Sequence, residues 1–442
     1  MHQFTTLIER IVPLLDAVAH EGPGLVRVAL PFRAQAGEGM LEWLAAQPLY
    51  PQFYWRHRSD EEEAAVCGAL QIFRDAEQAQ AFIRQQNNPA LRIWGLNAFD
   101  RVALEGIGEV ESLLFLPRLA LLRRGDEAEL VVYLYSDHSL RDDLARALRD
   151  LAALLPPQPL GSLQAAVLQA AHQPDRDAWC ALLQSALAAI ARNDFAKVVM
   201  ARRTTLTLRE PLRAAQFLAA SRAVNHRCYH FMLALAPHHA FLGSSPERLY
   251  RRIGRKLETE ALAGTVARGE NDEQCRANAI WLMQDGKNQH ENLLVVDDIC
   301  QRLRGSAGAP TLEVMAAEIV ALRKVQHLRR TIHVTLNQQD DADCLRRLQP
   351  TAAVAGLPRE PARRFIMQDE PFDRGWYAGS AGYLSLARAE FAVALRSALI
   401  VERQIHLYAG AGIVAGSDPQ QEWQEIENKA AGLRTLLEGE TA

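Results

Sequence analysis

Two side chains in the middle of the sequence could serve as a base and an acid. Lys197 lies in the apolar run Phe-Ala-Lys-Val-Val-Met-Ala, and Glu247 follows Gly243 and Pro246, which predict a bend between strands. Burial favours the neutral form of an amine, which is a base, and a carboxyl group facing a cavity can donate a proton. Taken singly, a lysine that reaches solvent and a glutamate paired with Arg248 are the more frequent alternatives.

Three further glutamates could bind a divalent cation. Glu291 falls on a predicted long helix, whereas Glu422 and Glu425 stand three residues apart and project from one side of a predicted final helix. Carboxylates from two helices that meet at a pocket would suit Mg²⁺, which takes few protein ligands and keeps several waters. The alternatives are a surface ion pair between Glu291 and Lys287 and a solvated acidic face in which Glu425 pairs with Lys429.

Small residues and one arginine could hold an anionic ligand. The pair Gly264 and Thr265 permits close approach of the backbone, and Gly410 and Gly412 do so in a second segment. Arg396 lies in an apolar strand, where its guanidinium could bind a carboxylate through two hydrogen bonds. The open alternatives are an ordinary turn, bulges in a twisted sheet, and a structural ion pair of Arg396.

The hydrophobic pattern predicts the elements that position these residues. Helices are expected in the first 20 residues and at 75–83, 139–155, 178–192, 212–224, 272–303 and 419–437. Strands are expected at 25–30, 53–55, 66–73, 91–96, 113–122, 130–135, 195–203, 228–265, 324–336 and 380–409. Asp75 and Ser139 are predicted to cap the helices that follow them. Runs of strands between long helices, without regular βαβ alternation, favour the α+β class.

Composition excludes several classes of protein. The formal net charge is −4, from 49 basic and 53 acidic residues without a long block of either sign, which argues against a nucleic-acid partner. No apolar run approaches the roughly 20 residues of a membrane span. Glu9 and Arg10 interrupt the first apolar pattern, so we expect an amphipathic helix there and no signal peptide. The six cysteines are scattered, with no CxxC pair, as expected of thiols in the cytoplasm.

The order of these segments resembles the chorismate-utilising enzyme family, which includes anthranilate synthase, aminodeoxychorismate synthase, salicylate synthase and the isochorismate synthases. The resemblance covers residues 178–438 and rests on Lys197-Val-Val, Gly-Ser-Ser-Pro-Glu247-Arg, Ala-Gly264-Thr265, His-Glu291-Asn, Gln349-Pro-Thr-Ala-Ala-Val-Ala-Gly356, Gly-Ser-Ala-Gly382-Tyr, Arg396, and Ala-Gly-Ala-Gly412-Ile followed by Ser-Asp-Pro-x-x-Glu422-x-x-Glu425. Tyr50-Pro-Gln-Phe-Tyr-Trp55 and Leu91-Arg-Ile-Trp-Gly-Leu-Asn-Ala-Phe99 extend it over the amino-terminal portion. These two segments are similar to the isochorismate synthases of the menaquinone pathway.

The resemblance implies a fold and an activity. The fold is one large α+β domain over residues 1–442, with two stacked antiparallel sheets flanked by helices, an amino-terminal portion (1–155) and a chorismate-binding core (178–438). The Pro-rich stretch 156–177 would otherwise be the best candidate for a domain boundary, and becomes a loop within that domain. The implied activity is that of a Mg²⁺-dependent isochorismate synthase, an isomerase that adds water at C2 of chorismate and expels the C4 hydroxyl.

The resemblance also implies a role for each candidate residue. Lys197 would be the general base and Glu247 the general acid. Glu291 and Glu425 would hold Mg²⁺ with Glu422 in support. The remaining positions would bind substrate: Gly264 and Thr265 along the ring, and Arg396, Tyr377 and the backbone of Ala411 and Gly412 at the enolpyruvyl carboxylate.

Water is the implied nucleophile. Lys197 matches the base of the water-using members, and Ala263 stands where aminodeoxychorismate synthases carry a lysine. We therefore expect no glutamine amidotransferase subunit, and we expect a monomer because the sequence shows no obvious segment for self-association. Gln349 replaces a histidine found in many members, and a glutamine cannot transfer a proton at neutral pH. A salicylate synthase, which shares the lysine and the glutamate, and a catalytically silent chorismate-binding module are the alternatives.

Overall fold

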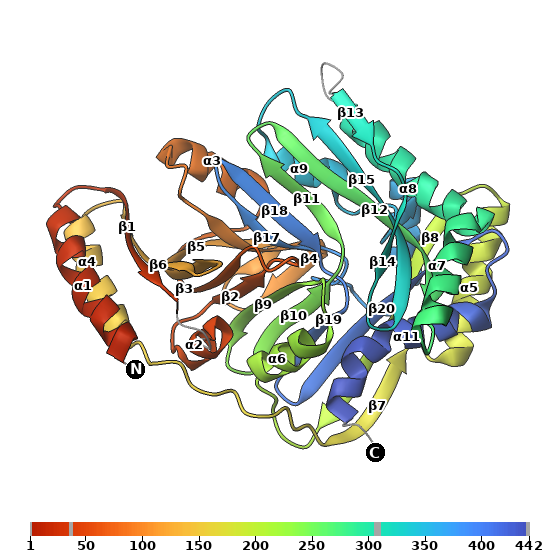
Figure 1. Cartoon of the computed structure of the whole chain (residues 1–442), viewed down its shortest axis with the longest axis horizontal. Helices are drawn as coiled ribbons and strands as arrows, with labels where there is room; N and C mark the ends of the chain where they lie inside the picture. Colours follow the sequence, from red (N-terminus) through yellow and green to blue (C-terminus); the bar gives the residue numbers. More distant parts are fainter. Residues whose placement is uncertain (1, 35–38, 305–310, 439–442) are drawn as a thin grey trace.

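The computed structural model describes residues 2–34, 39–304 and 311–438 as a mixture of helices and antiparallel strands (Figure 1). The helices are α1 (His2–Val18), α2 (Met40–Ala46), α3 (Ala76–Gln86), α4 (Leu140–Ala152), α5 (Arg176–Ala191), α6 (Ala214–Val224), α7 (Asp272–Gln284), α8 (Gly286–Arg304), α9 (Asp341–Leu348), α10 (Arg359–Asp369) and α11 (Pro419–Glu438). In Figure 1, α1 and α4 lie at one end of the molecule, and α5, α7, α8 and α11 lie at the other. The α+β class is confirmed.

The strands form two layers joined through the long strand β5 (Gly108–Arg124). The first layer runs, in order of pairing, through β1 (Gly24–Arg33), β6 (Glu127–Ser136), β5, β3 (Glu63–Phe73), β2 (Gln52–Arg56), β9 (Tyr229–Ala236), β10 (His239–Ser245), β19 (Ser397–Val401), β20 (Gln404–Val414) and β8 (Lys197–Leu208). Two short strands, β7 (Val167–Gln173) and β16 (Gly356–Leu357), complete its edge beside β8.

The second layer starts from the other half of β5. It runs through β4 (Ile93–Leu104), β17 (Ser380–Leu384), β18 (Arg388–Val393), β11 (Arg248–Ile253), β12 (Lys256–Ala267) and β15 (Val325–Thr335), with β13 (Thr311–Val314) and β14 (Glu318–Ala321) on β15. The early part of β5 pairs with β4 and its later part pairs with β3 and β6, so one strand serves both layers.

Alternation of side chains along the strands explains why the layers stack. Phe53 and Trp55 of β2 join the large core that also holds Trp94 of β4 and Tyr250 of β11, and the Phe53 and Trp94 ring centroids are 6.0 Å apart. Tyr54 points to the opposite side and joins a second core, which α1, α2, α4 and α6 cover. The first layer is therefore buried on both faces.

Two predicted caps are confirmed. The Asp75 side chain accepts a hydrogen bond from the backbone N–H of Gln78 at the start of α3, and Ser139 accepts one from Asp142 at the start of α4. The predicted hairpin of 113–122 and 130–135 is also present, as β5 and β6. The predicted first helix is α1, although Met1 lies outside the described residues.

The predicted helix at 272–303 is wrong in one respect, because it is two helices. Asp285 takes an extended backbone conformation after α7, and its carboxylate accepts the N–H of Asn288 and so caps α8. The predicted loop at 156–177 contains β7, an exposed edge strand that lacks the apolar alternation of a buried one. Helices α9 and α10 were not predicted, because polar residues dominate both segments.

The amino-terminal portion shares its sheets with the rest of the chain. Strand β2 pairs with β9, and β4 pairs with β17. These pairings favour the single-domain interpretation, which stays a prediction. Among the described helices, none is long and apolar enough to cross a membrane.

Candidate active site

A cavity lies where β8, β12, β15 and β20 meet helices α8 and α11. The predicted site residues that line it are Glu247, Gly264, Thr265, Glu291, Tyr377, Arg396, Gly412 and Glu425. Ala263, the position implicated in the choice of nucleophile, also lines it. The structure thus brings together side chains that are spread over almost 180 positions of sequence.

Lys197 occupies the first position of β8, and its side chain is 1% exposed. Its ammonium group donates a hydrogen bond to Glu291 Oε1 over 2.9 Å, so the lysine does not reach solvent. Burial alone would raise the pKa of Glu291, but Lys197, Lys429 and Lys287 more than offset it and hold that pKa below its usual range. Glu291 is therefore an anion, and it pairs with Lys197 of β8 rather than with Lys287 on its own helix.

Glu247 sits in the bend between β10 and β11 and is 2% exposed. Its Oε1 has no hydrogen-bond partner within the described chain. Burial and then the negative charge of Glu260 raise the pKa of Glu247 to about 8, and Lys197 and Lys429 offset only part of this. At neutral pH Glu247 thus carries a proton that it can donate. The expected alternative fails, because Arg248 pairs with other carboxylates.

Helix α11 brings Glu425 and Lys429 to the cavity and carries Glu422 three residues before Glu425. Glu425 Oε1 lies 2.6 Å from Lys429 Nζ, and Lys429 also donates to the carbonyl of Gly410 over 2.9 Å. Burial, and then the neighbouring charge of Glu425, raise the pKa of Glu422 to about 7. A cation between these carboxylates would relieve the repulsion that this value reflects.

The carboxylates are compatible with Mg²⁺. Glu291 and Glu425 face one cavity from two helices, and Mg²⁺ commonly takes one or two protein carboxylates, waters and an anionic substrate. A cluster of three or more metal-ligating side chains is not found among the described residues. Glu422 does not line the cavity.

Arg396 lies between β18 and β19, and its backbone has a left-handed conformation with φ 46°. Its Nη2 donates to His327 Nε2 over 3.2 Å, and His327 Nδ1 lies 2.9 Å from Thr265 Oγ1. Burial and the charge of Arg396 lower the pKa of His327 well below its usual value, so the imidazole is neutral. No carboxylate of the described chain pairs with Arg396, which leaves its guanidinium available to an anionic ligand.

The glycines make room for the reacting groups. A Cβ on Gly412 would lie 3.1 Å from both Glu291 Oε1 and Lys197 Cε, so a side chain there would displace the pair. Gly264 has φ +86°, a conformation that disfavours residues with a side chain. Tyr377 and Tyr408 also line the cavity, and their rings stack with centroids 5.1 Å apart.

Besides Glu422, the predicted positions Lys197, Ala411 and Gln349 are not among the residues that line the cavity, although Lys197 contacts Glu291, which is. The Ala411 side chain is buried in the core, and the neighbouring glycines of β20 line the cavity instead. Gln349 donates to the carbonyl of Ala98 and accepts from Ser380 Oγ, so its amide is occupied by structural contacts.

Sequence reasoning missed His327 as a residue of the cavity and assigned Lys429 only part of its contacts. His327 is one of two histidines within β15, and no local signal in the sequence distinguishes it from His333. Lys429 was considered only as a partner of Glu425, although it also contacts the backbone of β20. Its position four residues after Glu425 on a helix was the available signal.

The fold and the cavity define a class of enzymes, and comparison with known proteins identifies it. The chain belongs to the chorismate binding enzyme family, whose profile matches residues 14–438. It is 51% identical to isochorismate synthase MenF of Escherichia coli (strain K12) over 441 residues, with complete coverage of both chains. It is 40% identical to isochorismate synthase MenF of Haemophilus influenzae, with 90% of this chain and 89% of that one covered.

Solved structures agree. The menaquinone-specific isochorismate synthase MenF from Escherichia coli superposes with a TM-score of 0.93 at 50% identity, covering 98% of this chain and 99% of that one. Anthranilate synthase component I from Streptococcus pneumoniae superposes with a TM-score of 0.67 at 21% identity, over 92% of each chain, and supports the fold alone. The expected chorismate-utilising fold is confirmed.

Proposed function

We propose that this chain is an isochorismate synthase that converts chorismate into isochorismate with Mg²⁺ for menaquinone biosynthesis. The observation that carries the proposal is the buried, protonated Glu247, which lines the same cavity as Glu291, the hydrogen-bond partner of Lys197. The reaction needs an acid for a poor leaving group and a base for water, and the cavity offers both. The close relatives named above support the pathway assignment.

Substrate binding follows from the charges around the cavity. Chorismate has two carboxylates, an enolpyruvyl ether and a hydroxyl on a diene ring. Arg396 lacks a carboxylate partner in the described chain and would bind the enolpyruvyl carboxylate, together with Tyr377 and the backbone at Gly412. Gly264 and Thr265 would lie along the ring, with Thr265 oriented by His327.

Glu291 and Glu425, with Glu422 in support, would hold Mg²⁺, which when bound neutralises the ring carboxylate and withdraws electron density from the diene. Lys197 acts as the neutral amine, after its own proton has passed to solvent, and takes a proton from a water molecule whose oxygen forms a bond to C2. The C1–C2 double bond moves to C1–C6, the C5–C6 double bond moves to C4–C5, and the C4–O bond breaks. Glu247 protonates the departing hydroxyl, which leaves as water.

Each turnover adds one water and releases one water, so substrate and product are isomers. Lys197 ends with an extra proton and Glu247 ends without one, and transfer of a proton from the lysine to the glutamate through solvent restores the site. Because chorismate and isochorismate are isomers of similar stability, we expect the reaction to be reversible.

Water is the proposed nucleophile in place of ammonia. Ala263 lines the cavity without offering a charged group, and Lys197 lies close to the metal-binding carboxylates. The proposal therefore includes no glutamine-hydrolysing subunit, and we propose that the chain acts as a monomer.

The test is to incubate purified protein with chorismate and Mg²⁺ and to identify the product by chromatography and mass spectrometry. Isochorismate is the expected product, and chelation of Mg²⁺ should stop its formation. Salicylate with pyruvate would identify a salicylate synthase, and an amino product on addition of ammonium salts would identify an aminating enzyme. Binding of chorismate without turnover would identify a silent module.

A further inference from the structure

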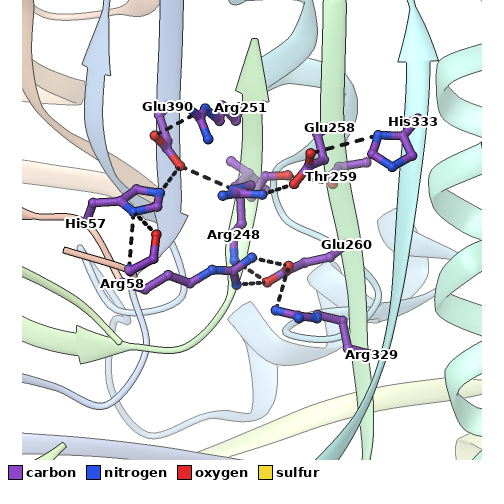
Figure 2. A network of polar contacts seen from close by, with 12 residues as sticks. His57, Arg58, Arg248, Arg251, Glu258, Thr259, Glu260, Arg329, His333 and Glu390 are labelled. Atoms are coloured by element: carbon purple, nitrogen blue, oxygen red, sulfur yellow. Dashed lines mark hydrogen bonds and ion pairs between the residues drawn. The ribbon is translucent and has the colours of Figure 1, made fainter. Parts of the chain in front are cut away.

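A buried polar network, shown in Figure 2, contacts the backbone of the two residues that flank Glu247. Its centre is Arg58, in the loop after β2, and Glu260 of β12, whose side chain is 1% exposed. Neither residue lines the cavity, so neither contacts the substrate in the proposed reaction. The inference below rests on the proposed function, because it concerns the acid of that reaction.

The contacts of this pair fix the backbone on both sides of Glu247. Arg58 binds Glu260 through two parallel hydrogen bonds, with Nη1–Oε1 at 2.6 Å and Nη2–Oε2 at 2.7 Å. Arg58 Nη1 also donates to the carbonyl of Pro246 over 2.8 Å. Glu260 Oε1 accepts the backbone N–H of Arg248 over 2.7 Å. The residue before Glu247 and the residue after it are thus tied to the same ion pair.

The pair also places a negative charge behind the acid. Burial would raise the pKa of Glu260, but Arg58 and Arg248 more than offset it, so Glu260 is ionised. The charged groups that influence Glu247 come from four elements: Glu260 on β12 favours its protonated form, whereas Lys197 on β8, Lys429 on α11 and Arg58 favour ionisation. Among these charged groups, Glu260 is the anion that raises the pKa of Glu247, whereas the three cations lower it.

We propose that the Arg58–Glu260 pair is a positioning device for the reaction, which holds the bend that carries Glu247 and keeps a negative charge behind its carboxyl group. Arg58 ties the bend from the amino-terminal portion of the chain, and Glu260 ties it from the neighbouring strand. The pair acts on chorismate only through Glu247.

The test is the pH profile of kcat/KM in Glu260→Gln, which removes the charge and keeps an oxygen that can accept the Arg248 N–H. Without the charge, Glu247 loses its proton at lower pH, so the alkaline fall in activity should move to lower pH by roughly half a unit or more. In parallel, infrared titration of the carboxyl band that disappears in Glu247→Gln should show the same displacement without substrate.

A matched control separates this effect from general damage. Asp341→Asn breaks a second buried ion pair of β11, in which Arg252 Nη2 lies 2.6 Å from Asp341 Oδ2 and which does not line the cavity. The Asp341→Asn variant should be less stable, but the alkaline fall in its kcat/KM (the alkaline limb) should stay at the wild-type pH. The midpoint of its infrared titration should also be unchanged. Glu260→Asp, which keeps the charge, should restore the wild-type limb.

An unmoved limb and infrared midpoint in a folded Glu260→Gln protein would overturn the charge effect. If that variant does not fold, Arg58→Lys tests the positioning effect, because lysine keeps the positive charge but cannot bind Glu260 and Pro246 as a fork. It should lower kcat roughly tenfold or more at every pH with KM little changed, and a wild-type kcat would overturn the proposal. The product made by the wild-type enzyme tests the proposed function separately.

Discussion

Replacing Glu247 with glutamine should stabilise the folded protein at neutral pH while it removes the acid of the reaction. The carboxyl group is buried, and burial with the charge of Glu260 raises its pKa from 4.5 to about 8. A carboxyl group with a raised pKa stabilises the fold relative to its ionised form only at low pH. That contribution is complete below the unfolded pKa and is lost as pH rises towards the folded pKa.

The magnitude follows from the two values. Each pH unit between 4.5 and about 8 is worth about 1.4 kcal/mol of unfolding free energy, so the wild type loses roughly 3 kcal/mol between pH 5 and pH 8 through this group. Glutamine does not titrate and does not lose this stability. The difference in unfolding free energy between Glu247→Gln and wild type should therefore grow by that amount over this interval.

The assay is urea unfolding of both proteins at pH 5, 6, 7 and 8. Turnover of chorismate is measured with the same protein preparations in the absence of urea. Comparing pH values removes the constant effect of changing the side chain. Turnover of the variant should fall by about 100- to 10,000-fold. A stability difference that stays constant from pH 5 to pH 8 would refute the assignment of Glu247 as a buried, protonated acid.

The other predictions concern single groups of the cavity. Lys197→Ala should lower kcat by about 100- to 10,000-fold with KM nearly unchanged, and near-normal turnover of the folded variant would leave the lysine a structural role only. Arg396→Ala should instead raise KM for chorismate strongly, because the substrate carboxylate loses its partner; an unchanged KM would place that carboxylate elsewhere. Glu291→Gln and Glu425→Gln should each fold and lose most Mg²⁺-dependent turnover, measured by titration with Mg²⁺, and full activity of either at limiting Mg²⁺ would remove it as a ligand. Gly412→Ala should lower turnover at unchanged stability, because its Cβ would lie 3.1 Å from Glu291 Oε1 and Lys197 Cε, and wild-type kcat would show that the pair can shift without loss.

Local patterns in the sequence were sufficient for much of the fold. Asp75 and Ser139 predict where their helices begin, because a capping side chain and the backbone N–H that donates to it are close in sequence. The break at Asp285 was missed because the apolar spacing continues across it, and only the backbone shows that the aspartate caps a second helix. Strand β7 was missed because it is an exposed edge strand. It has no buried face, so its sequence lacks the alternation of apolar and polar residues.

The candidate site shows a different limit. Motifs identified most of the residues that line the cavity, but they could not show which groups touch. Lys197 and Glu291 are 94 positions apart and meet only because β8 and α8 border one cavity. The protonation of Glu247 depends on burial and on Glu260 of a neighbouring strand, and neither quantity is visible in a linear sequence. His327 contributes through tertiary contacts alone.

The measurement that tests the central claim most directly is conversion of chorismate by the wild-type enzyme with Mg²⁺ in H₂¹⁸O. In the proposed mechanism the new C2 hydroxyl comes from a water molecule activated by Lys197, and the lost C4 hydroxyl is the group that Glu247 protonates. This mechanism takes the oxygen at C2 from solvent. It therefore predicts isochorismate with one ¹⁸O atom at C2, seen by mass spectrometry. Isochorismate that forms without solvent label would show that the hydroxyl migrates within the substrate and would contradict the account.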